Sequence, residues 1–508
     1  MVAHRINSSL GGLGSPIKSN TNFIVSARSF WSGLLFLFFS CLVTPGVPYW
    51  SVLPFLFIAF LVVSFSYPTV GLVFIVFTHS FSGVIRWKDQ DAALLAGFGA
   101  ILISLFIMST IVRGLIQRRF KLPVYRSDWW ASKLMFIVWL LFIILLIANV
   151  AGNWGGILKT VMMFREYILP LLLFPAAISA LVARPQDCRS ILIALFLGGV
   201  IIAGINIFHY IFELSIPRSR WVMSFDSSSG LISDYPELRV VFGLIPVPRM
   251  NHLLGLSGAS AGGVYFMVIG VLGYLFAKDN QKKIWRRLLY LGSSISVVAA
   301  VMTVSLAVIV ALVFAIMFLY LSLSKQKAYV SFVLGGLAVG LMVLVLLASS
   351  EGGDSLVMGL NYILEVWHGI VVPALLQFDS IFLGDGLGLK SGEALGVADF
   401  LNEKYAQTTD QWLFVAFYQL GIVGFILTCA FFALPLWMGY KISRACQRGN
   451  IGYVALGASV VIAGFLGFSH GAAPIERLFS LPLILMIAII VASARQVLGH
   501  PYSVSKDT

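Results

Sequence analysis

Charged side chains are scarce in this chain of 508 residues, where Asp, Glu, Lys and Arg together make up 11% of the sequence. A soluble globular protein carries about 25% of these residues. Apolar residues reach 59%, and the mean hydropathy is +0.95. The scarcity of charge argues against a soluble enzyme. It predicts an all-α polytopic membrane protein, in which each crossing needs roughly 20 mainly apolar residues.

The chain also lacks the signatures of several common enzyme sites. Its four cysteines, at positions 41, 188, 429 and 446, are isolated from one another, so we expect neither a disulfide framework nor a zinc site. The HExxH pattern of metalloproteases and the GxxxxGK[ST] phosphate loop of ATPases are both absent. We therefore expect neither a metal-dependent protease or hydrolase nor ATP hydrolysis by this chain.

The apolar runs divide the chain into spans and two long loops. Runs long enough to form a spanning helix occur about fourteen times. They lie at about 30–46, 48–66, 67–84, 92–112, 131–150, 166–183, 190–212, 260–277, 288–303, 304–324, 328–349, 411–440, 451–469 and 478–494. The break between 303 and 304 is weak, and joining the weakest neighbours leaves about twelve spans. The segments we expect are a cytoplasmic tail at 1–29, N-terminal spans within 30–213, a loop at 214–259, central spans within 260–349, a second loop at 350–410, C-terminal spans within 411–494 and a cytoplasmic tail at 495–508.

Basic residues gather in three short loops, at 113–126, 278–287 and 441–448. Cytoplasmic loops of membrane proteins carry an excess of Lys and Arg. Placing these loops inside makes all other segments alternate consistently and puts about two thirds of the 34 basic residues on the cytoplasmic side. Both termini are then cytoplasmic, and both long loops are outside. The same rule accounts for the net charge of +13, so nucleic acid is not an expected partner.

Four arginines in the first long loop are informative because positive charge is normally avoided on the outer face. They are Arg218, Arg220, Arg239 and Arg249. One interpretation is salt bridging to acidic residues of the same loop. The other is anion binding, because a guanidinium group forms bidentate, charge-assisted bonds to phosphate oxygens. Arg165 lies where a short outer loop enters a span, and it is open to the same two interpretations.

Two further polar residues lie where the long loops meet spans. His252 can act as a general base because the ordinary pKa of histidine lies near neutrality, although a lone histidine is more often structural. Asp410 can orient or deprotonate a sugar hydroxyl, or it can cap the helix that follows. Both residues are candidate catalytic groups in these interpretations.

Three stretches at the boundaries between loops and spans carry a family resemblance. They read RVVFGLIPVPRMNHLLGLSGASAGG at 239–263, WHGIVVPALLQFDSIFLGDGLGL at 367–389 and TTDQWLFVAFYQLGIVGFI at 408–426. Their order resembles the bacterial O-antigen polymerase and O-antigen ligase family of cell-surface polysaccharide assembly. In the third stretch, a polar pair precedes a helix and a Gly-Ile-x-Gly turn follows. The chain departs from the family at Leu306, where an arginine is common.

The resemblance implies the helical bundle of a lipid-dependent sugar transferase that uses no metal or cofactor. The donor would be a glycan on undecaprenyl diphosphate in the outer leaflet of the bacterial inner membrane, and the acceptor would be a lipid-linked repeat unit. Arg239 and Arg249 would contact the diphosphate, and Asp410 would lie near the acceptor. Membrane lipids and a chain-length regulator are the other partners that the resemblance suggests.

Two alternatives to a polymerase stay open. A ligase, which transfers a finished glycan to the lipid A core, often has a His-Asn pair where this chain has Asp410 and Gln411. A transporter or lipid-linked oligosaccharide flippase belongs to another class. It should show repeated halves, interrupted helices and charges near mid-membrane. The sequence shows no convincing internal repeat, and the charges gather in the loops, so we favour the polymerase.

Overall fold

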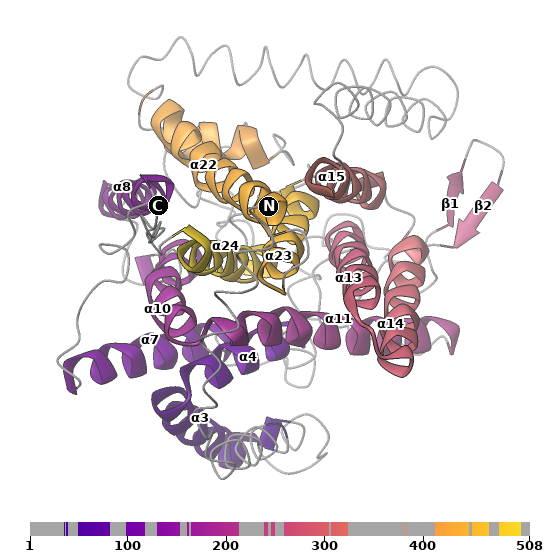
Figure 1. The fold of residues 1–508 in the computed structure, drawn as a ribbon, viewed down its shortest axis with the longest axis horizontal. Coiled ribbons are helices and arrows are strands. Elements are labelled where there is room, and N and C mark those ends of the chain that lie inside the picture. Colours follow the sequence, from indigo (N-terminus) through magenta and orange to yellow (C-terminus); the bar gives the residue numbers. More distant parts are fainter. Residues whose placement is uncertain are drawn as a thin grey trace, which may run out of the picture.

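Long apolar stretches form helices throughout the part of the chain that the computed structural model describes (Figure 1). The described residues are 35, 37–38, 49–81, 98–116, 130–152, 160–161, 164–212, 238–241, 245–248, 259–303, 306–323, 382, 412–446, 450–466 and 477–498.

In chain order, the helices and strands are α3 (Tyr49–Ser66), α4 (Pro68–His79), α7 (Phe98–Ile116), α8 (Trp130–Gly152), η2 (Phe164–Ile168), α10 (Leu169–Ala183), η3 (Pro185–Asp187), α11 (Cys188–Ile211), β1 (Leu238–Val241), β2 (Ile245–Pro248), α13 (Ala259–Asp279), α14 (Lys283–Met302), α15 (Leu306–Leu323), α22 (Trp412–Ala445), α23 (Asn450–Leu466) and α24 (Arg477–Leu498). Here η2 is a π-helical turn and η3 a 3₁₀ turn.

Each described α-helix falls on a span that the apolar runs predict. Six of these helices are long and apolar enough to cross a membrane, which is consistent with a polytopic membrane protein. The break that we expect between 303 and 304 is present, because α14 ends at Met302 and α15 begins at Leu306. The span expected at 328–349 lies outside the described residues.

α4 is the clearest case of a helix shorter than a full crossing. Its 12 residues extend roughly 18 Å at 1.5 Å per residue, against about 30 Å of hydrocarbon. Tyr67 alone separates α4 from α3, and Pro68 starts the new helix there because proline fits the first helical turn. The expected span at 67–84 is therefore helical only as far as His79 within the described residues.

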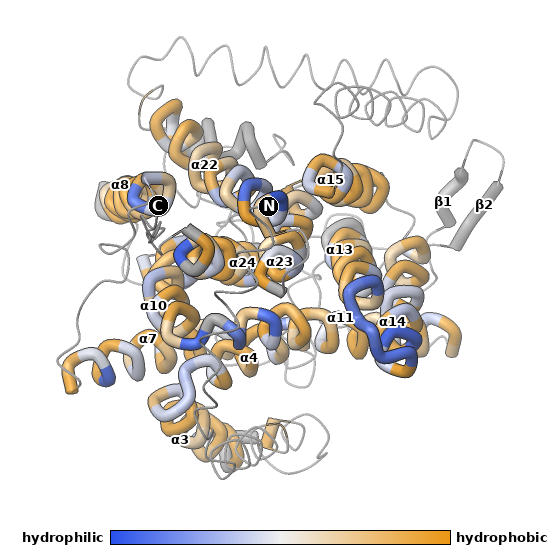
Figure 2. Tube along the Cα trace, in the orientation of Figure 1, coloured by the Kyte–Doolittle hydropathy of each residue, from blue (hydrophilic) through white to orange (hydrophobic). Residues whose placement is uncertain are grey.

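Two features of the helices suit an apolar solvent better than water. Prolines lie inside α3, α10, α22 and α24, and membrane helices tolerate internal proline when neighbouring helices satisfy the freed backbone groups. α8 also turns large apolar side chains outward, with Ile137 and Ile144 exposed at 51% and 54%. Figure 2 shows that apolar residues cover most of the helices and that hydrophilic residues gather at helix ends.

Glycines allow close contact among α11, α13 and α14. A side chain at Gly273 of α13 would collide with the ring of Phe196 of α11, and one at Gly199 of α11 would lie 2.7 Å from Ile269 of α13. The Ser293 hydroxyl of α14 donates a 2.6 Å hydrogen bond to the carbonyl oxygen of Gly270. Small residues at helix contacts are typical of membrane bundles, where close packing and hydrogen bonds stabilise association.

A buried polar pair joins the end of α4 to α13. The hydroxyl groups of Ser80 and Tyr265 lie 2.7 Å apart, and both residues are fully buried. The ring of Tyr265 also stacks on Phe465 of α23, with 6.1 Å between the ring centroids. These contacts tie helices far apart in sequence to one another in the core.

Contacts between helix ends agree with the predicted alternation of helix directions. Among the ends predicted to be cytoplasmic, Arg189 at the start of α11 forms a 3.2 Å ion pair with Asp279 at the end of α13. Trp130 at the start of α8 lies 5.4 Å, between ring centroids, from Trp437 in the last third of α22. Each contact thus joins two helix ends that the sequence places on the same side of the membrane. The contacts do not show which side that is, and the assignment to the cytoplasm rests on the charge distribution.

Candidate functional site

A β-hairpin lies in the first long loop, where the sequence predicts no regular element. β1 and β2 pair antiparallel, with Arg239 opposite Val247 and Leu238 opposite Pro248. The strands contain several β-branched residues, which favour extended backbone. Pro246 and Pro248 lack the N–H group that a further strand would need, so β2 suits an edge position. Arg239 therefore lies in a short two-stranded hairpin, in the part of the sequence that connects α11 to α13.

Arg165 lies in η2, a five-residue π-helical turn directly before α10. Its side chain is half-buried, and its Nε atom is fully buried. The neighbouring residues Tyr167 and Ile168 are buried at 7% and 2% exposure, which fixes the turn against the core. π-helical turns are rare and are frequent at functional sites. The guanidinium group of Arg165 is thus partly buried at an irregular turn, at a helix end predicted to face outward.

The long helix α22 is broken at Gly421. This residue has φ 67° and ψ −171°, a backbone conformation that is essentially restricted to glycine. The break brings the side chain of Leu420 so close to Gly424 that a Cβ there would collide with it. Both glycines of the Gly-Ile-Val-Gly sequence are therefore required. The segment from Trp412 to Leu420 forms a separate short helix directly after Asp410 and Gln411.

A signal for this break is present in the sequence. α22 has 34 residues, or about 51 Å of continuous helix, which is much longer than a crossing of about 30 Å. The span that we expect at 411–440 is therefore not one continuous helix. The break falls where the family resemblance places a Gly-Ile-x-Gly turn, at Gly421.

The predicted site residues divide into two groups. Arg165 and the backbone of Arg239 are described, and Figure 1 shows that the structure does not bring their elements together: the hairpin lies beyond α14, whereas α10 lies on the other side of α13 and α23. Five predicted residues lie outside the described residues, and their roles stay predictions: His252, Asp410, Arg218, Arg220 and Arg249.

The sequence from Gly258 to Gly262 reads GASAG and matches the GxSxG pattern of α/β-hydrolases. That pattern needs a sharp turn from a strand into a helix, which exposes the serine above a sheet. Here α13 begins at Ala259, so Ser260 lies in its first turn, and β2 ends ten residues earlier than Gly258. The match therefore does not indicate a nucleophilic serine.

Within the described ranges, no three His, Cys, Asp or Glu side chains gather in a way that could hold a metal ion. Comparisons of the chain with models of known protein families and with curated proteins find no match.

Proposed function

We propose that this chain is a polymerase of cell-surface polysaccharide, either O-antigen or exopolysaccharide. It transfers a glycan from undecaprenyl diphosphate to a lipid-linked repeat unit at the outer face of the bacterial inner membrane. In this proposal the chain crosses the membrane about twelve to fourteen times. Both termini are cytoplasmic, both long loops are periplasmic, and the transfer requires no metal ion.

The observation that carries the proposal is the place of Arg165. Its guanidinium group is half-buried at a π-helical turn, directly before a predicted span, and ionisable groups at the boundary of a span tend to be functional. The phosphates of a lipid carrier would lie at the outer ends of the spans, because only its chains enter the hydrocarbon. Arg165 is therefore suited to contact the diphosphate of a lipid-linked donor.

The transfer itself needs a cation near the leaving group and a base near the acceptor. The acceptor hydroxyl oxygen attacks the anomeric carbon of the donor sugar, and a new C–O bond forms. The bond from that carbon to the diphosphate oxygen breaks, and the diphosphate leaves with the electron pair. The hydroxyl proton passes to a base, for which His252 and Asp410 are the candidates. Arginines stabilise the charge that develops on the leaving diphosphate.

Deleting the gene and sizing the surface glycan on gels tests the proposed activity. A strain without the polymerase should still display single repeat units, but chains of several units should be absent. Unchanged chain lengths in the deletion strain would refute the proposal.

Single substitutions then test the diphosphate contact. We expect Arg165→Ala to abolish long chains while the protein stays in the membrane, and Arg165→Lys to keep part of the activity because it retains the charge. Lys441→Ala, at an exposed cation near the other end of α22, is the matched control and should leave chain lengths unchanged. Full activity of Arg165→Ala would show that Arg165 does not contact the diphosphate. The same alanine and lysine substitutions test Arg239 and Arg249.

One observation favours the second candidate, a transporter or flippase of lipid-linked oligosaccharide. Transporters use interrupted helices, whose free backbone groups bind substrate near mid-membrane, and α22 is interrupted at Gly421. The deletion experiment separates the two functions. Loss of a flippase would leave repeat units on the cytoplasmic side, and loss of a ligase would leave long chains on the lipid carrier. Loss of a polymerase would leave single units at the surface.

A further inference from the structure

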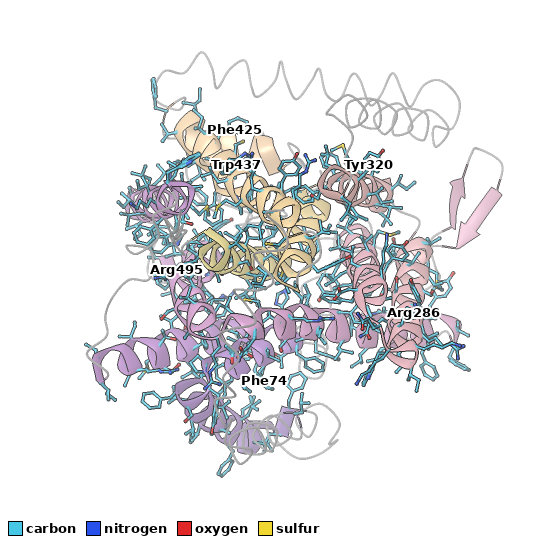
Figure 3. All side chains as sticks on the ribbon, viewed as in Figure 1. Phe74, Arg286, Tyr320, Phe425, Trp437 and Arg495 are labelled. Atoms are coloured by element: carbon cyan, nitrogen blue, oxygen red, sulfur yellow. The ribbon has the colours of Figure 1, made fainter. Side chains whose placement is uncertain are left out.

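The turn between α13 and α14 carries the densest positive charge in the part of the chain that the structure describes. Five cations lie within ten residues at this turn, and all are exposed: Lys278, Lys282, Lys283, Arg286 and Arg287. We call this set the basic turn. Figure 2 shows it as a hydrophilic end on two otherwise apolar helices, and Figure 3 shows Arg286 on the outside of the turn.

The charge of the basic turn is not neutralised within the described part of the protein. Asp279 is the single acidic residue between Lys278 and Arg287, and it forms an ion pair with Arg189 of α11. No ion pair joins a cation of the basic turn to any other described residue. Within the described part of the protein, no acidic side chain pairs with a cation of the basic turn.

Lys278 lies in the last turn of α13, but the other four cations lie at the start of α14, which is an unfavourable position for positive charge. The N-terminus of a helix carries a partial positive charge, which attracts anions and repels cations. The first turn of α14 has no acidic residue, and its N-cap residue, Lys282, makes no side-chain capping bond. A charge pattern that violates a local rule without internal compensation is typical of a functional surface. A bound anion would relieve both the mutual repulsion and the unfavourable helix end.

Large apolar side chains lie beside the cations on the same exposed turns. Ile284, Trp285, Leu288 and Leu291 are exposed at 73%, 57%, 51% and 59%. Three of them are spaced by four and three residues and so share one helix face, while the cations at 282, 283, 286 and 287 occupy the other. Further along α14, one face of the helix becomes buried, beginning with Gly292, Ser293 and Ser296. The start of α14 thus extends past its neighbours with both faces uncovered.

We propose that the basic turn and the apolar face beside it bind anionic phospholipids of the inner leaflet. A lipid satisfies both halves of this surface at once, because its phosphate meets the cations and its acyl chains cover the apolar residues. A nucleic acid or an acidic peptide would neutralise the cations but leave Ile284 and Leu288 in water. Basic segments near membrane spans bind anionic lipid in this way, and tryptophan is enriched at the membrane interface, where Trp285 would lie.

The experiment measures lipid binding by the full-length protein in nanodiscs or mixed micelles that contain phosphatidylglycerol or, as reference, phosphatidylcholine alone. Native mass spectrometry counts the lipids that stay bound, and a thermal unfolding curve reports stabilisation. We expect Arg286→Gln with Arg287→Gln to lower the affinity for phosphatidylglycerol on the order of tenfold or more, since each cation near an anionic surface contributes several-fold. Lys441→Gln with Arg444→Gln is the matched control.

The control pair fits because both residues are exposed cations at a helix end predicted to be cytoplasmic, but they lie over aromatic rings of their own helix. Lys441 lies 5.8 Å from the ring centroid of Trp437, and Arg444 lies 5.5 Å from that of Tyr440. We expect this pair to keep wild-type lipid affinity. Equal effects of the two double variants would overturn the proposal, because they would indicate a general charge effect.

A measurement on the wild-type protein and a charge-conserving variant keep the proposal testable even if the glutamine variants fold poorly. Raising the salt concentration should weaken the preference for phosphatidylglycerol, because screening acts on exposed charges. Arg286→Lys with Arg287→Lys, which keeps the charge, should retain binding. Equal stabilisation by both lipids, or stronger stabilisation by soluble polyphosphate or an acidic peptide than by phosphatidylglycerol, would refute a lipid site.

Discussion

Replacing Gly421 by alanine tests whether the break in α22 is built into the fold. At φ 67° and ψ −171°, a Cβ atom is strongly disfavoured, and residues held in such regions cost about 1–3 kcal/mol. Alanine can avoid this cost by adopting helical angles. That change would straighten α22 and carry the segment from Trp412 to Leu420 to a new position.

Both responses should be measurable. If the break persists, we expect the free energy of unfolding to fall by about 1–3 kcal/mol, as measured by SDS titration of the purified protein in mixed micelles. If the helix straightens, the protein can stay stable, but the short helix after Asp410 moves. Glycan chains should then be lost or shortened. In both cases Gly421→Ala should differ clearly from the native protein.

Gly204→Ala provides the control. Gly204 lies in α11, and a Cβ atom there would meet no other atom within 4 Å. Alanine favours helix over glycine by roughly 1 kcal/mol, so this variant should be as stable as the native protein or more so. If Gly421→Ala matched Gly204→Ala in both stability and glycan length, the reasoning about the break would be refuted.

Two further predictions concern the helix contacts. Gly273→Leu should lower the free energy of unfolding by about 1–3 kcal/mol or more, because the new side chain collides with Phe196. Gly99→Leu, where a Cβ meets nothing within 4 Å, should cost little in the same assay, and equal effects would contradict the packing argument. Tyr265→Phe should cost about 0.6 to 1.7 kcal/mol, the range of hydrogen bonds between membrane helices, because it leaves the buried hydroxyl of Ser80 without its partner. A double-mutant cycle with Ser80→Ala measures this coupling, and a coupling of zero would show that the bond does not stabilise the protein.

The sequence determined where the helices lie, because two requirements act locally along an apolar run. Its side chains avoid water, and its backbone N–H and C=O groups must form hydrogen bonds within the run. Runs without charge must become helices in a membrane, so α8, α11 and α13 could be located within a few residues. The boundary between α14 and α15 was also predictable. The hairpin was not, because the prolines of β2 argue against a strand unless it lies at an edge.

The sequence singled out Arg165 and Arg239 as outer-face cations, but spacing along a chain does not tell how far apart two loops lie in space. The tertiary structure decided that the hairpin and α10 lie on different sides of α13 and α23. It also decided that α22 breaks at Gly421, since a break depends on what packs against the helix as well as on the glycine itself.

Apolar content and charge distribution are sums over local residues, and they alone determined the helical class and the predicted orientation of this protein. The ion pair of Arg189 with Asp279, the contact of Gly273 with Phe196 and the bond of Ser80 with Tyr265 join residues that are far apart along the chain. Such contacts depend on how helices pack in three dimensions. For that reason only the tertiary structure decided that Asp279 pairs with Arg189 and that, among the described residues, the five cations of the basic turn form no ion pair.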